Sequence, residues 1–372
     1  MSNVFLIEQQ GLFVPSRDPL VVNRDEVWEF DLLDTTDAVT GQLVGVEPGG
    51  LSLDFSVHRE IRTTGSLSVV GDEVGDIRWS AVRVAPRYSP DGGVTWWDWG
   101  VYLTATPEIV KDGGKWSAVI DLYDKLAIPA RAKAAASYAV DAGDNPISEA
   151  LTVLALSGSH RVSAEPTSET LAAPMVWEPN TPHLRAMNDL LASANYFSTS
   201  VGPRGSFRFD PYVRPQDRGV AYTLRSGRDS IHKSRIVTTQ DSFDVPNRVT
   251  LIGPSDGETP ALVSAPATDE DPASDYSYPT RGFWVDHTET VEATSQSVLD
   301  ALAARRLVEL QSPSRSLGIR FAMLPPDRVW LNSVLRLVDT PSGVDAYGVL
   351  QSFSVSSVTG APVEARLVEV AR

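Results

Sequence analysis

Side chains that commonly carry out chemistry are few and scattered in this sequence of 372 residues. Cysteine is absent, which excludes disulfides, thiolate nucleophiles and zinc–thiolate or iron–sulfur sites. The histidines lie in separate segments without the spacing of metal ligands, at His58, His160, His183, His232 and His287. We therefore expect no metal ion and no cofactor, and we assign no catalytic residue.

One short segment, Asp286-His287-Thr288-Glu289, places an imidazole beside carboxylates. Neighbouring residues of a strand point to opposite faces, so we expect a solvated strand face here and not a catalytic pair. The glycine-rich loops that cradle phosphates and the Gly-x-Ser-x-Gly turn of serine hydrolases are also missing. The two catalytic carboxylates of a glycosidase need to meet only in the folded protein and follow no sequence motif. Glycosidase chemistry therefore stays an open alternative.

Three neighbouring tryptophans, Trp96, Trp97 and Trp99, are the best candidates for a binding function. On a strand, Trp97 and Trp99 would share one face and Trp96 would lie on the other. Aromatic side chains are typical of protein cores and of subunit interfaces, and exposed indoles also bind sugars. We expect at least one of the three in the core or at a subunit interface, with sugar binding as the alternative.

The charge balance excludes a general nucleic-acid binder. Lysine and arginine total 32 against 48 acidic residues, giving a net charge of −16 that repels phosphate backbones and anionic lipids. No apolar run reaches the roughly 18 residues of a membrane span, and no signal peptide is recognised. We expect a soluble, unexported protein whose acidity serves solubility or keeps passing DNA from adhering.

Residues 1–130 have the pattern of an antiparallel β domain. Apolar residues alternate with polar ones over residues 51–57 and 77–81, which predicts strands. Asp91-Gly92-Gly93 and Asp112-Gly113-Gly114 supply the residues that tight hairpin turns need. Several strands in such a short stretch predict a small barrel or sandwich.

Residues 131–219 predict two helices followed by a hairpin. Asn145-Pro146 begins the first helix with a cap and a proline at its first turn, and Gly158 can end it. The second helix follows Pro182 and ends at Asn195. Two short strands then flank a turn at residues 202–205.

Residues 220–372 return to a β pattern with one long helix. The stretch 254–280 is acidic and rich in proline, so we expect a surface excursion or a disordered insert there. A helix is predicted over 294–311. The remaining strands are predicted at 248–252, 317–321, 334–338, 347–356 and 363–370.

The order of these elements resembles the phage tail hub proteins, namely the relatives of the late control protein D, the hub part of type VI spike proteins and the N-terminal hub of tail-associated lysins. The segments that carry the resemblance are 190–197 (LLASANYF), 205–211 (GSFRFDP), 245–253 (VPNRVTLIG), the helix 294–311, 335–339 (LRLVD), 347–350 (YGVL) and the closing strand. The sequence departs from the family at the 254–280 stretch and at Met323-Leu324-Pro325-Pro326.

The resemblance implies a mainly β fold with α+β inserts, in which two small barrels related to the tail-tube fold are linked by helix–hairpin segments. It implies a non-enzymatic homotrimer whose six barrels join a six-fold tail tube to a three-fold tip while DNA passes through. The implied partners are the distal tail protein or tail tube, tip, fibre or spike proteins and the tape measure protein. The implied location is the virion, assembled in the host cytoplasm without membrane insertion. Two alternatives remain open, a carbohydrate-active β-sandwich protein and a receptor-binding tail-tip protein.

Overall fold

The computed structural model describes residues 24–158, 161–240, 243–253, 263–291, 296–311 and 315–370. The chain divides into two compact units. The first unit runs to Ile236 and resumes at Gly318, and the second covers Val237–Leu317.

The first unit is built around a large, mostly antiparallel sheet. Its N-terminal strands are β1 (Val27–Leu33), β2 (Val39–Gln42), β3 (Val46–Ser56), β4 (Thr63–Val70), β5 (Arg83–Ser89), β6 (Trp97–Asp98), β7 (Tyr102–Asp112) and β8 (Lys115–Asp124). Its later strands are β14 (Val220–Arg225), β19 (Ser316–Phe321), β20 (Val334–Asp339), β21 (Val344–Ser356) and β22 (Val363–Val370). The expected mainly β fold is therefore confirmed, and the described strands form no closed sheet.

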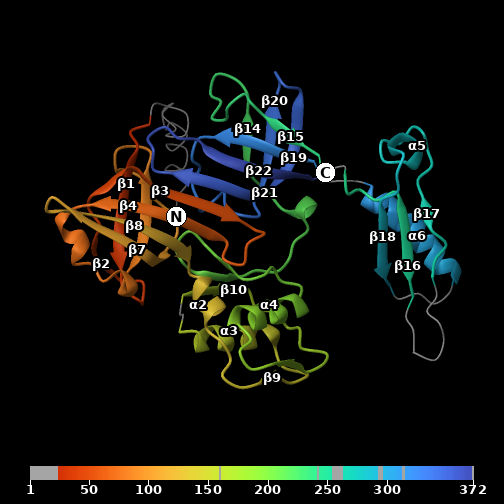
Figure 1. Ribbon diagram of the computed structural model, residues 1–372, viewed down its shortest axis with the longest axis horizontal. Coiled ribbons are helices and arrows are strands. Elements are labelled where there is room, and N and C mark those ends of the chain that lie inside the picture. Colours follow the sequence, from red (N-terminus) through yellow and green to blue (C-terminus); the bar gives the residue numbers. More distant parts are fainter. Residues whose placement is uncertain are drawn as a thin grey trace, which may run out of the picture. The chain divides into compact units, whose positions relative to one another are not determined.

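Pairing between β3 and β21 joins the N-terminal and C-terminal strands. The sheet runs β19-β22-β21-β3-β4-β8-β7-β5-β1-β2, with β14 beside β20 and β20 beside β21. At the junction, Phe55 of β3 lies opposite Phe353 of β21, and their rings stack with centroids 4.2 Å apart. Strands some 300 residues apart thus share one hydrogen-bonded ladder, visible where the orange and blue arrows meet in Figure 1.

The local patterns explain most of these strands. In β3, Leu51, Leu53 and Phe55 are buried while the residues between them face outward, as period-two alternation requires. The β7–β8 hairpin turns at Gly113 and Gly114, which both adopt positive φ. The prediction of a strand over 77–81 is wrong. Residues Trp79–Ala81 form a 3-10 turn instead, because so short an alternation also suits a tight turn. A second 3-10 turn spans Asp72–Gly75.

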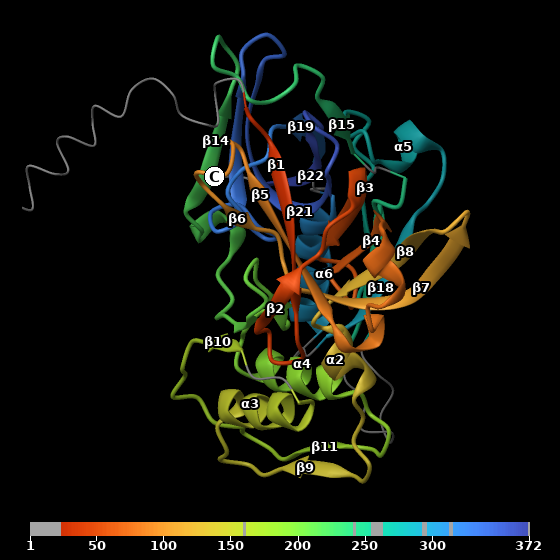
Figure 2. The same ribbon diagram turned by 90° about the vertical axis from the view of Figure 1, so that its left-hand side faces the viewer.

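The helix–hairpin segment, coloured yellow to green in both ribbon views, lies at one end of this sheet (Figure 2). It contains α2 (Ala127–Arg131), β9 (Tyr138–Val140), α3 (Pro146–Leu156), β10 (Val162–Ala164), β11 (Met175–Trp177), α4 (His183–Ser193), β12 (Ser200–Val201) and β13 (Phe207–Phe209), followed by a 3-10 turn at Pro215–Asp217. Asn145 caps α3 by accepting from the amides of Ile147 and Ser148, as predicted. The helices and the hairpin share one apolar core.

The second unit is a small sheet covered by one helix. Its elements are β15 (Val237–Thr239), β16 (Arg248–Ile252), β17 (Ala267–Thr268), α5 (Tyr278–Arg281), β18 (Asp286–Thr290) and α6 (Gln296–Leu310). Strand β16 lies between β17 and β18, antiparallel to the first and parallel to the second. Val249 and Leu251 of β16 pack against Leu299 and Ala303 of α6.

Of the two alternatives expected for residues 254–280, the described part, 263–280, fits the surface excursion, because most of its residues are exposed. It contains β17 and α5 and belongs to the second unit, whose other residues satisfy some of its polar groups. Asp269 is nearly buried and accepts hydrogen bonds from Ser274 Oγ at 2.6 Å and from Gln311 Nε2 at 2.8 Å. Residues 254–262 lie outside the described residues.

Candidate functional site

The most heavily constrained place in the first unit is the hairpin made by residues 198–209, which we call the anchor hairpin. Several of its backbone carbonyls accept hydrogen bonds from residues far away in the sequence. Four of these pairs are Arg62 Nε to Thr199 O (3.2 Å), Trp330 Nε1 to Val201 O (3.1 Å), Gly100 N to Pro203 O (2.8 Å) and Lys125 Nζ to Gly205 O (2.9 Å). The hairpin is therefore fixed both to the N-terminal strands and to the loop before β20.

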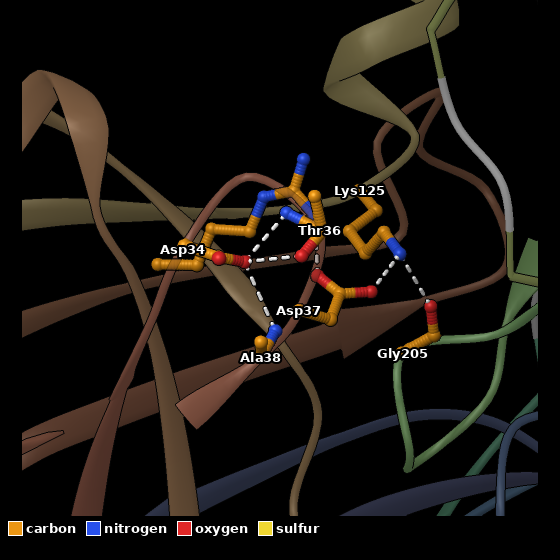
Figure 3. Close-up of polar contacts among 7 residues, drawn as sticks. Asp34, Thr36, Asp37, Ala38, Lys125 and Gly205 are labelled. Atoms are coloured by element: carbon orange, nitrogen blue, oxygen red, sulfur yellow. Dashed lines mark hydrogen bonds and ion pairs between the residues drawn. The ribbon is translucent and has the colours of Figure 1, made fainter. Parts of the chain in front are cut away.

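Lys125 is the most deeply buried of these donors. It follows β8 directly, and its side chain is only 1% exposed. Its ammonium donates to Asp37 Oδ2 at 2.6 Å as well as to the Gly205 carbonyl (Figure 3). Burial lowers the pKa of Lys125, and the hydrogen bond to Asp37 opposes that shift. A buried ammonium of this kind is tolerated because a carboxylate and a carbonyl replace its water.

Asp37 receives its position from the turn between β1 and β2. Asp34 Oδ1 accepts from the Thr36 hydroxyl (2.7 Å) and from the amides of Ala38 (3.0 Å) and Thr36 (2.7 Å), and these hydrogen bonds, the hydroxyl's first, lower the pKa of the Asp34 carboxyl (Figure 3). The turn places Asp37 at φ 66° with its carboxylate directed inward. There Asp37 also pairs with Arg83 of β5, so two cations share one buried carboxylate.

A second buried carboxylate, Asp124, lies next to Lys125 in the sequence. Its oxygens accept from the backbone amides of Thr63 (2.6 Å) and Leu126 (2.8 Å), which joins the start of β4 to the segment that leads into α2. Burial is the largest influence and raises the pKa of Asp124 to about 6, although both amides and the nearby Arg62 act in the opposite direction.

The Gly205 position tolerates only glycine. Its φ is +75°, and a Cβ atom built there would lie 2.5 Å from Val101 Cγ2. The turn therefore needs both the left-handed backbone and the missing side chain to bring its carbonyl to Lys125. All these contacts fix one segment of the first unit against another.

A surface pocket of about 420 Å³ adjoins the anchor hairpin. Its polar lining includes Arg208, which pairs with Asp210 at 3.0 Å, and Arg218, which donates to the Asn332 carbonyl at 3.0 Å. Both cations are engaged within the protein: Arg208 pairs inside its own segment, and Arg218 holds the segment after the hairpin to the loop before β20.

The three tryptophans have different environments. Trp99 is 2% exposed and packs with Phe55 and Trp330 at the junction of β3 and β21. Trp97 is buried and tilts against Tyr88, with ring centroids 5.5 Å apart. Trp96 is half-buried beneath the Arg87 guanidinium. Of the three, Trp96 alone keeps appreciable surface for a subunit contact, and the two buried rings offer no platform for a sugar.

The structure does not bring the described histidines together. His58 contacts Gln351, His183 contacts Ser157, and His287 contacts Glu289 on the strand face beneath Arg306. His160 lies outside the described residues. Across the part of the chain that the structure describes, no group of three or more potential ligands could hold a metal ion.

His232 and Asp339 form a buried pair that sequence patterns did not reveal. His232 Nε2 lies 3.1 Å from Asp339 Oδ1, with side chains 1% and 3% exposed, and Ser230 Oγ lies 3.2 Å from His232 Nδ1. This order of groups resembles a hydrolase triad. However, Ser230 Oγ donates to the His232 carbonyl, and Ser342 lowers the pKa of Asp339 by hydrogen bonding. The pair therefore serves as a structural contact that holds residues 230–232 to the end of β20.

Sequence reasoning also missed Lys125 and Asp37. The available signal was a lysine inside the apolar run YDKLAIPA, in a chain with few lysines. Its partner could not be found, because Asp37 precedes it by 88 residues and belongs to an exposed-looking turn.

In the described residues, no helix is long and apolar enough to cross a membrane.

The fold is similar to that of solved phage tail proteins, which confirms the resemblance at the level of the fold. The tail protein from Neisseria meningitidis superposes with a TM-score of 0.62 at 14% identity, covering 92% of this chain and 96% of that one. The tail protein of prophage MuSo2 from Shewanella oneidensis gives 0.58 at 12% identity, covering 92% and 98%. A chain of the Francisella PdpA–VgrG complex gives 0.58 at 8% identity, covering 98% of this chain and 55% of that one. No protein-family model and no curated protein matches the sequence.

Proposed function

We propose that this chain is the structural hub of a phage tail, without enzymatic activity. Three copies would form a ring with pseudo-six-fold outline between a six-fold tail tube and a three-fold tip. The observation that carries the proposal is the fold likeness to tail proteins, which extends over nearly the whole of both chains. A likeness of that extent concerns the complete architecture and not one common domain.

The hub function also accounts for the two regions of strands and for the anchor hairpin. In the proposed ring, the N-terminal strands and the C-terminal strands each contribute one barrel-like body, so three chains supply six. Such a ring needs each chain's two bodies held at a constant relation. The β3–β21 ladder and the four hydrogen bonds to the anchor hairpin supply that rigidity.

The charge of the chain suits a channel for DNA. We propose that the wall of the ring's opening is acidic, because a net charge of −16 with few lysines disfavours adhesion of phosphates. A ring structure whose inner wall is lined mainly by arginine would contradict this part of the proposal.

The proposed partners are the distal tail protein or tail tube on one side, tip, fibre or spike proteins on the other, and the tape measure protein. Electron microscopy of phage particles, with gold-labelled antibodies against this chain, tests the location. We expect label only at the tip end of the tail. Label on the capsid, or on fibres that project from the tip, would contradict the hub function, and the second result would favour receptor binding.

A further inference from the structure

The second unit carries five aromatic side chains close together near its surface. We call them the aromatic patch: Phe243, Tyr276, Tyr278, Phe283 and Trp284. Phe243 is 73% exposed, Phe283 42% and Tyr278 41%, while the other two rings are half-buried. Single exposed apolar residues are ordinary, but a cluster of large rings is typical of a binding surface. Neither the fold nor the anchor hairpin requires it.

The rings form an ordered surface. Tyr278 stacks on Trp284 with ring centroids 4.5 Å apart, and Phe243 tilts against Phe283 at 6.1 Å. Two guanidinium groups lie over the rings. Arg281 is 5.3 Å from the Tyr276 ring and 5.7 Å from the Phe283 ring, and Arg248 is 4.9 Å from the Trp284 ring. The patch is therefore preorganised, which lowers the entropic cost of binding.

Asn247 holds the loops that present the patch. Its side chain is completely buried, and its Nδ2 donates to the carbonyls of Tyr276 (2.9 Å) and Phe283 (3.0 Å). Its Oδ1 accepts from the amide of Val285 at 2.8 Å. One buried amide thus fixes both ends of the loop that contains α5. Both polar atoms of the Asn247 side chain therefore form hydrogen bonds that hold the loops of the aromatic patch.

The rim of the patch is acidic. Asp244 follows Phe243 directly, Asp275 precedes Tyr276, and both are exposed. Exposed Glu270 and Asp271 belong to the same loop, which the hydrogen bond from Tyr278 N to Asp269 O closes at 3.1 Å. Of the two guanidinium groups, Arg248 pairs with Asp286, while Arg281 donates to the neutral Val245 carbonyl and keeps its charge. The four exposed carboxylates outnumber that one charge, so a partner meets aromatic rings with an excess of neighbouring negative charge.

We propose that the aromatic patch is a docking site for a basic segment of another protein, one that presents apolar side chains flanked by lysine or arginine. Aromatic anchors inside a charged rim are the usual anatomy of such interfaces. A glycan fits less well, because the two phenylalanines that supply much of the exposed ring surface have no polar group to orient a sugar. The inference does not depend on the proposed hub function.

The test uses the full chain and two nine-residue peptides, one alternating leucine with lysine and one alternating leucine with glutamate. Calorimetric titration should show the basic peptide binding at least about ten-fold more tightly, with the affinity falling as salt is raised. The double variant Phe243→Ser, Phe283→Ser should weaken that binding by at least about ten-fold. Val308→Ser, which changes a residue 67% exposed on α6 of the same unit, is the matched control and should leave binding unchanged.

Three results would overturn the proposal: equal affinity for the two peptides, equal binding by the double variant and the parent, or binding of chitohexaose or maltohexaose that the double variant loses. The last result would assign the patch to glycans. If the double variant fails to fold, Phe243→Ser alone replaces it, because that ring is the most exposed of the five. Loss of the Phe243 ring should still selectively weaken binding of the basic peptide.

Discussion

Lys125 is a cation with almost no access to water, and its position depends on two partners, Asp37 and the Gly205 carbonyl. Loss of the Lys125 ammonium would leave Asp37 paired with Arg83, but it would remove the hydrogen bond that this side chain donates to the Gly205 carbonyl. A buried acceptor left without a donor is costly. Lys125 should therefore matter more to stability than any surface lysine.

We expect Lys125→Met to lower the free energy of unfolding by about 1–3 kcal/mol, because the buried Gly205 carbonyl loses its donor while Asp37 keeps Arg83. The exposed Lys115→Met should change it by less than about 0.5 kcal/mol. Urea unfolding followed by circular dichroism measures both variants. Equal effects of the two substitutions would show that the buried contact does not hold the hairpin.

Asp124 gives the fold a pH dependence with a defined sign. Burial raises its pKa from 3.8 to about 6, so the folded chain binds this proton more tightly than the unfolded chain does. Its ionisation therefore destabilises the fold as the pH rises from about 4 to 6, and the contribution reaches about 3 kcal/mol above that range. Below about pH 4 the penalty is absent.

The variant Asp124→Asn lacks this titration. We expect the unfolding free energy of the wild type, relative to that of the variant, to increase as the pH falls from 7 to 4, by up to about 3 kcal/mol. Urea titrations at several pH values provide the measurement. A difference between the two proteins that stays constant with pH would contradict the assignment.

At the scale of elements, the anchor hairpin depends on its turn. Gly205→Ala introduces a Cβ into a position with φ +75° and within 2.5 Å of Val101 Cγ2. Gly113→Ala, in the β7–β8 turn, has a comparable φ of +55° but no atom within 4 Å. We expect Gly113→Ala to cost about 1 kcal/mol and Gly205→Ala at least about 2 kcal/mol more, measured by thermal or urea unfolding. Equal costs would mean that the hairpin can move away from the sheet freely.

Asn247 is the equivalent point in the second unit. Asn247→Ala removes the donor to Tyr276 O and Phe283 O and the acceptor for Val285 N, and should destabilise that unit by about 2–3 kcal/mol. Hydrogen exchange should report faster exchange over residues 269–286. Thr288→Ala, on an exposed position of β18, is the control and should leave exchange unchanged. Unchanged exchange in the Asn247 variant would show that Asn247 does not hold the loops that present the aromatic patch.

Sequence patterns predicted elements well where the information is local. The Asn145 cap, the β7–β8 glycines and the alternation of β3 each depend on a few neighbouring residues. Sequence patterns failed where the pattern is short or where the interacting residue lies far away in the sequence. Three alternating residues at 77–81 form a turn, and the polar pattern of 263–280 did not decide between a surface excursion and disorder, because Gln311 and Asn247 satisfy some of its polar groups from elsewhere. The Lys125–Asp37 contact and the β3–β21 pairing require the tertiary fold itself.

At the scale of the molecule, one hydrogen-bonded ladder joins the beginning of the chain to its end, and the helix–hairpin segment is fixed to both parts. This construction gives the first unit a single rigid body from segments that are distant in sequence. Rigid subunits of this kind suit a closed ring, whose interfaces repeat only if each copy has the same shape. The likeness to a solved tail protein extends over 92% of the chain and concerns this same fold.

The solution mass of the purified full chain tests the hub proposal most directly. Size-exclusion chromatography with multi-angle light scattering, repeated over a range of concentrations, should give three times the 40.3 kDa of one chain. Negative-stain images of that species should show a ring with a central hole and a pseudo-six-fold outline. A mass of one chain at every concentration, with no ring in the images, would contradict the proposal that this protein closes into a trimeric hub by itself.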